Sequence, residues 1–173
     1  MTEAEKQLHN YLVMVAEHQI HNIRTINWRY RGFDDLLLKE GDWNEPPETK
    51  LPKGVRRGRP KQCYMNAYRL ATRLPDEYTY VEGMAIPDVV SIPMGHAWCV
   101  DNNGKVVDPT WPLPGKAYFG VHLSAEFIQR HSAKTGVYGV FGGYDKETIK
   151  LLQCGFPPMA VVRLAEIKTL IEV

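Results

Sequence analysis

Three residues of this chain are of the types that can together perform nucleophilic acyl chemistry. They occur in the order Cys63, His96 and Asp108. A cysteine attacks a carbonyl carbon through its sulfur, a histidine takes up the thiol proton and later returns it, and a carboxylate fixes the orientation of the imidazole. This chemistry requires the three side chains to touch. The elements that carry them must therefore bring them together.

Cys63 lies at the predicted start of a helix. Apolar side chains recur at steps of three and four residues between Pro60 and Pro75, namely Met65, Ala67, Tyr68, Ala71 and Leu74. The free N–H groups and the partial positive charge of a helix N-terminus stabilise a thiolate relative to a thiol. Taken alone, a free cysteine is more often a small buried core residue, so that alternative stays open.

His96 and Asp108 lie on two strands that are predicted to form a hairpin around Asn102-Asn103-Gly104. A two-residue loop would pair Cys99 with Asp108 and turn His96 to the opposite face. A three-residue loop with its glycine in the left-handed region pairs Trp98 with Asp108, so that His96 and Asp108 share a face. Diagonal neighbours lie about 7–8 Å apart, within reach of a hydrogen bond between side chains. We favour the three-residue loop.

The predicted order of elements is typical of an α+β fold, with helices before and after a run of antiparallel strands. We expect an amphipathic helix near the N-terminus and a shorter helix over 33–38. Ser124 and Asp145 are the expected N-caps of two later helices, and 159–164 is an expected last strand. The expected central strands are 78–86, 96–100, 105–108 and 117–123.

The length of 173 residues fits a single domain with its own hydrophobic core. We expect a helical N-terminal part (1–45), an irregular basic loop (46–61) and a core that carries the catalytic residues (62–173). No segment approaches the roughly 18 apolar residues of a membrane span, and the first residues do not resemble a signal peptide. Three cysteines are too few for a disulfide framework, which indicates a reducing compartment. We therefore expect a cytoplasmic protein.

The charge of the chain is unevenly distributed. The total is +1, from 21 Lys and Arg against 20 Asp and Glu, which argues against a protein that coats DNA. Residues 50–73 nevertheless contain no acidic side chain. The basic residues of this segment are Lys50, Lys53, Arg56, Arg57, Arg59, Lys61, Arg69 and Arg73. We expect this segment to favour a thiolate at Cys63 and to contact an acidic substrate, with Arg56, Arg57 and Arg59 as candidate contacts.

The motifs around the three residues resemble those of a known superfamily. Cys63 opens a helix, His96-Ala97-Trp98 begins a strand, and Val107-Asp108-Pro109-Thr110-Trp111 follows, as in the transglutaminase-like branch of the papain-like cysteine enzymes. The resemblance covers residues 62–111. It implies a papain/transglutaminase-like core in which the cysteine-bearing helix packs on an antiparallel sheet, and a thioester intermediate. Members hydrolyse peptides, deamidate glutamine or transfer acyl groups, so the resemblance does not define the reaction.

The chain also departs from this superfamily. Papain-like proteases carry an oxyanion-stabilising Gln where this chain has Arg57, and the calcium loops of animal transglutaminases have no counterpart. The oxyanion hole would use the backbone N–H of Cys63 and a second donor, for which Gln62, Trp43 and Tyr80 are candidates.

Other residues near the motifs have several interpretations. Trp98 and Trp111 are core residues or line an acyl-group cleft, and Glu82 contacts substrate, pairs with an Arg or lies on a solvated edge. The glycine-rich residues 139–143 lack the Lys-Ser or Lys-Thr of a phosphate loop, which favours a flexible loop at the rim of the site. A zinc site that includes Cys99 is not favoured, because there is no CxxC pair. We expect no metal and no cofactor.

Two functions are consistent with these features. The first is a cysteine-dependent amide hydrolase or acyltransferase (a protease, deamidase or transglutaminase-like enzyme) that acts on a protein, a peptide or a small amide. The second is a catalytically silent binding module or inhibitor, in which residues 50–73 dock an acidic partner, a nucleotide or a nucleic acid. Nucleic acid is the less favoured partner, and the sequence does not name the substrate.

Overall fold

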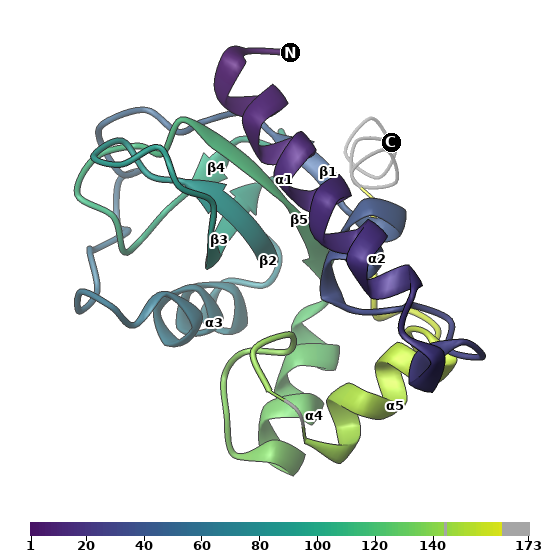
Figure 1. Cartoon of the computed structure of the whole chain (residues 1–173). Helices are drawn as coiled ribbons and strands as arrows, with labels where there is room; N and C mark the ends of the chain where they lie inside the picture. Colours follow the sequence, from purple (N-terminus) through teal and green to yellow (C-terminus); the bar gives the residue numbers. More distant parts are fainter. Residues whose placement is uncertain (144, 164–173) are drawn as a thin grey trace.

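The computed structural model describes residues 1–143 and 145–163, and in this part of the chain it confirms the α+β class. A curled antiparallel sheet has the strand order β1-β5-β2-β3-β4 (Figure 1). The strands are β1 (Asp42–Asn44), β2 (Tyr78–Ile86), β3 (Met94–Asp101), β4 (Val106–Val107) and β5 (Ala117–Leu123). The helices are α1 (Glu3–Ile20), α2 (Phe33–Glu40), α3 (Cys63–Arg73), α4 (Ala125–Thr135) and α5 (Lys146–Cys154), with a 3₁₀ turn at Ile23–Thr25.

The two faces of the sheet are both buried, but against different partners. Side chains alternate between the faces along each strand, so Ala97 and Cys99 point to one side of β3, and His96 and Trp98 point to the other. The first side belongs to the larger core, against which α1, α2 and α3 pack. The second side forms a smaller cluster that contains Trp98 and Tyr118. Figure 1 shows α4 and α5 as a pair beyond the end of the sheet.

The hairpin between β3 and β4 has the expected three-residue loop. Cys99 pairs with Val107, and the backbone N–H of Asp101 donates to the carbonyl of Lys105 at 2.9 Å, so the loop consists of residues 102–104. Gly104 has a φ of 82°, the left-handed conformation that this turn requires. Because Cys99 lies opposite Val107, the next position along the two strands places Trp98 opposite Asp108. The predicted register is therefore confirmed.

The local predictions for the helices are confirmed in most cases. The side chains of Ser124 and Asp145 cap the N-termini of α4 and α5. Strand β1 was not expected, because three residues are too few to show a periodic pattern. The expected strand over 159–164 is reduced to a single bridge between Leu123 and Val161, and Leu164 lies outside the described residues. No helix of the described part combines the length and the apolar character that a membrane span needs.

Candidate active site

Cys63 is the first residue of α3, as predicted, and its side chain is partly buried. The chain enters the helix through Lys61, whose φ of 61° is rare for a residue with a side chain. The N-cap residue Gln62 makes no side-chain bond to the helix. The N–H groups of the first turn therefore have no capping side chain, and the sulfur of Cys63 lies at the positive end of the helix dipole.

His96 joins Cys63 to Asp108. Its Nε2 lies 2.8 Å from Oδ2 of Asp108, and the thiol of Cys63 lies close enough to the imidazole to act on its pKa. The imidazole is 2% exposed. Burial works to lower the pKa of His96, but the hydrogen bonds to Asp108 and Cys63 outweigh it, so the pKa is raised above its usual value. The structure thus brings the three predicted residues together.

Asp108 is held by hydrogen bonds at both carboxylate oxygens. Oδ1 accepts the backbone N–H groups of Thr110 at 2.8 Å and Trp111 at 3.1 Å. Oδ2, which accepts from His96, also accepts the hydroxyl of Tyr118 at 3.2 Å. A buried carboxylate needs such donors to offset the loss of water. The Asp-Pro-Thr segment therefore supplies the carboxylate and the turn that fixes it.

Aromatic rings enclose the imidazole. Trp111 stacks on His96 with ring centroids 3.8 Å apart and an interplanar angle of 10°. Trp98 is fully buried and its indole N–H donates to Asn44, so it supports His96 from the core and does not line a cleft. Arg57 donates to the backbone carbonyl of Trp111. Trp98 is therefore a core residue, the first of its two interpretations, and Arg57 also holds the backbone of Trp111.

Glu82 is buried, contrary to the interpretation as a solvated edge. Its carboxylate accepts the hydroxyl of Tyr80 at 2.7 Å and the backbone N–H groups of Val140 at 2.8 Å and Phe141 at 2.7 Å. Within the described residues no arginine pairs with it. Burial raises the pKa of Glu82 to about 7, although these hydrogen bonds act in the opposite direction. Glu82 therefore ties the glycine-rich loop to the centre of the sheet.

The glycine-rich loop forms one wall of a cavity beside Cys63, which agrees with its expected place at the rim of the site. The cavity has a volume of about 650 Å³ and is lined by Gln62, Tyr64 and Met65 on one side and by residues of 135–143 on the other. Gly139 packs against Tyr64 so closely that a Cβ atom would lie 3.1 Å from its ring. The position of Glu82 in an apolar strand was the sequence signal for this anchor, but its partners lie far away in the chain.

Of the three candidates for the second oxyanion donor, Trp43 lies elsewhere and Tyr80 is already engaged. Trp43 packs on Phe119, with β5 and β2 between its strand and β3. The Tyr80 hydroxyl is committed to Glu82. Gln62 remains as a candidate because it adjoins Cys63 in the chain; its buried Oε1, which has no hydrogen-bond partner among the described residues, is an acceptor and not the donor that an oxyanion needs.

The remaining candidates lie away from the triad. Arg56 lines a separate cavity, and Arg59 is exposed, with its carbonyl accepting the side chain of Asn66. Cys99 points into the larger core and donates to the carbonyl of Ala67, away from His96. No cluster of metal-ligating side chains occurs in the described residues.

Comparisons with protein-family models, with curated proteins and with solved structures gave no match for this chain. We therefore infer its function from the geometry of its own residues.

The environment of Glu82 predicts a pH dependence of stability. Burial raises the folded-state pKa of Glu82 from 4.5 to about 7, so its protonated carboxyl contributes to the stability of the folded state. This contribution to the free energy of unfolding is fully present below pH 4.5 and is lost as the pH rises through 7. The Glu82→Gln variant has no titrating group at this position, so this pH-dependent contribution to its unfolding free energy is absent. We expect the difference in unfolding free energy between the native protein and Glu82→Gln to shrink by about 2 kcal/mol from pH 5 to pH 7.5 in urea titrations.

Glu77→Gln, at an exposed position before β2, is the matched control and should leave the pH dependence unchanged. A Glu82→Gln variant whose unfolding free energy runs parallel to that of the native protein at both pH values would contradict the assignment.

Proposed function

We propose that this protein is a cysteine-dependent amide hydrolase or acyltransferase that works through a thioester intermediate, with a core of the papain/transglutaminase-like type. The observation that carries the proposal is the position of His96, which bonds Asp108 through Nε2 and lies near enough to the Cys63 thiol for the two groups to affect each other's proton. One imidazole between a thiol at a helix start and a fully bonded carboxylate is the arrangement that activates a cysteine nucleophile.

The reaction follows from these contacts. His96 takes the thiol proton as the sulfur of Cys63 attacks the substrate carbonyl carbon and forms the C–S bond. The C–N bond then breaks, and His96 gives the proton to the departing amine, which leaves a thioester on Cys63. Water or a second amine next attacks the thioester, again with His96 as base. The C–S bond breaks, and the proton returns to the sulfur.

The oxyanion formed in each step needs donors near Cys63. The backbone N–H of Cys63 belongs to the first turn of α3, which no side chain caps. The side-chain N–H₂ of Gln62 supplies the second donor in our proposal, because Gln62 adjoins the nucleophile and lines the cavity of about 650 Å³. The substrate carbonyl would enter from this cavity.

Other features of the site support the same function. Trp111 covers one face of the imidazole, which excludes water from the His96–Asp108 pair and strengthens its electrostatic coupling. The three cysteines are free, which suits a thiol enzyme of the reducing cytoplasm. We propose a protein, peptide or small amide as substrate.

The proposal is tested with p-nitrophenyl acetate, a small activated ester that acylates reactive thiols. We expect release of p-nitrophenol together with an acetyl adduct on Cys63, located by peptide mass mapping. Cys63→Ser should abolish both, whereas Cys154→Ser, which changes an exposed cysteine on α5, should leave both intact. An adduct that forms equally in Cys63→Ser would overturn the proposal.

The Asp108–His96 bond predicts a large kinetic effect of Asp108→Asn. The side chain of Asn keeps the shape of the carboxylate, but it has one acceptor oxygen where Asp has two, and it carries no charge to stabilise the imidazolium. We therefore expect kcat for ester cleavage to fall by about 10²–10⁴. KM should change little, because Asp108 is buried behind His96.

Asp88→Asn, an exposed change outside the site, is the control and should retain full activity. An Asp108→Asn enzyme that folds normally and keeps kcat within twofold of the native value would show that His96 does not depend on this carboxylate.

A further inference from the structure

A second cavity lies on α3, separate from the one beside Cys63. It has a volume of about 460 Å³ and is bounded by α3, the basic loop at Val55–Gly58, Pro109 and Gln129 of α4. Three arginines line it: Arg56 from the loop, and Arg69 and Arg73 from the helix. The cavity thus gathers part of the basic segment 50–73 around one space.

The walls of this cavity are held in place by one face of α3 and by hydrogen bonds to the basic loop. Asn66, Arg69 and Arg73 share one face of α3, since residues three, four and seven apart in a helix lie on the same side. The side chain of Asn66 donates to the carbonyl of Arg59 at 2.8 Å, and the N–H of Gly58 donates to the carbonyl of Pro109 at 2.8 Å. These bonds hold the loop that carries Arg56 against the helix.

The positive charge of the cavity is not neutralised. No acidic side chain lines it, and none of the three arginines has an ion-pair or hydrogen-bond partner among the described residues. Like charges that share one space repel each other unless an anion binds between them. The cavity therefore carries the positive charge of three arginines and has no acidic side chain in its lining to balance it.

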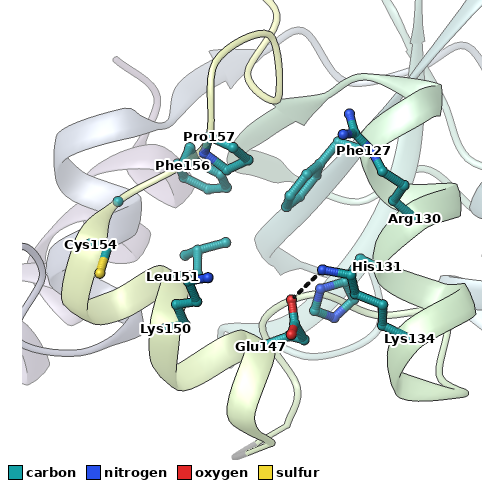
Figure 2. Close-up of a pocket in the computed structure, with 11 residues that line it drawn as sticks. Phe127, Arg130, His131, Lys134, Glu147, Lys150, Leu151, Cys154, Phe156 and Pro157 are labelled. Carbon is teal, nitrogen blue, oxygen red and sulfur yellow. Dashed lines mark hydrogen bonds and ion pairs between the residues drawn. The ribbon is translucent and has the colours of Figure 1, made fainter.

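A pocket between α4 and α5 shows the contrasting case (Figure 2). It has a volume of about 360 Å³ and is also lined by basic side chains. There, however, Lys134 pairs with Glu147 across the pocket at 3.1 Å, and Arg130 pairs with Glu126 at 3.0 Å. Two of the three basic side chains of the α4–α5 pocket are therefore paired, Lys150 being the third, whereas none of those in the cavity on α3 is paired among the described residues.

We propose that the cavity on α3 binds the phosphate group of a small molecule, either inorganic phosphate or a nucleoside monophosphate. Guanidinium groups offer forked donors that match phosphate oxygens. A volume of about 460 Å³ is within the range of small-molecule sites and exceeds the needs of a lone phosphate. Val55 and Leu70 provide apolar contacts, and Thr72 and Gln129 provide polar contacts, for the remainder of the ligand. This site does not depend on the chemistry proposed for Cys63.

The test is isothermal titration calorimetry of the full chain with inorganic phosphate, with AMP and with a twelve-nucleotide single-stranded RNA. We expect one saturable site for phosphate or AMP. Arg69→Gln/Arg73→Gln should weaken binding about tenfold or more, because each guanidinium contributes charge-assisted hydrogen bonds. Arg56→Gln, a single change on the loop, should weaken binding independently of the helix.

Lys50→Gln/Lys53→Gln is the matched control, since it removes two charges from the same basic segment but none from the cavity lining. It should leave affinity within twofold, and Cys63→Ser should bind like the native protein. Equal weakening by the two double variants, no saturable binding of phosphate or AMP, or RNA binding much tighter than AMP binding would each overturn the proposal. The last result would indicate a nucleic-acid surface instead.

Discussion

The site depends on one buried hydrogen bond, between Nε2 of His96 and Oδ2 of Asp108. Both side chains are almost completely excluded from solvent, so neither can exchange its partner for water at low cost. The backbone of the Asp-Pro-Thr turn occupies the second carboxylate oxygen, which leaves the first for the imidazole. With Nε2 engaged, the other ring nitrogen is the one left available to Cys63. The orientation of the histidine is thus decided by the carboxylate behind it.

Much of this arrangement follows from local sequence signals. The length of the hairpin loop determines whether His96 and Asp108 share a face, and the left-handed glycine at 104 selects the three-residue loop. The proline before α3 and the periodic residues within it locate Cys63 at a helix start. These predictions succeeded because each concerns residues that are close together in the chain.

The predictions that failed concern partners far away in the chain. Glu82 is neither solvated nor paired with an arginine, because the backbone N–H groups of Val140 and Phe141 reach its carboxylate from a loop nearly 60 positions later. Trp98 had two interpretations, and the contact that decides for the core is also distant, because Asn44, on a strand too short to predict, accepts its indole N–H. Periodicity and turn signals do not report such contacts, so these roles required the structure.

The basic segment 50–73 also divides into parts that the sequence does not separate. Arg57 anchors the turn that carries Trp111, whereas Arg56, Arg69 and Arg73 surround a cavity on a different face of α3. Arg57 therefore belongs to the structure around His96, and the other three arginines line the cavity that we propose for phosphate. The uneven charge of the chain reflects two sites and not one.

The most direct measurement of the central claim compares the three cysteines within the same protein. Cys154 is exposed, Cys63 is partly buried, and burial raises the pKa of Cys99. Exposure alone would make Cys154 the most reactive towards iodoacetamide. If His96 and the start of α3 activate Cys63, peptide mapping after brief labelling at pH 6.5 will show Cys63 alkylated fastest, and His96→Ala will remove that advantage. Faster labelling of Cys154 in the native protein would contradict the account.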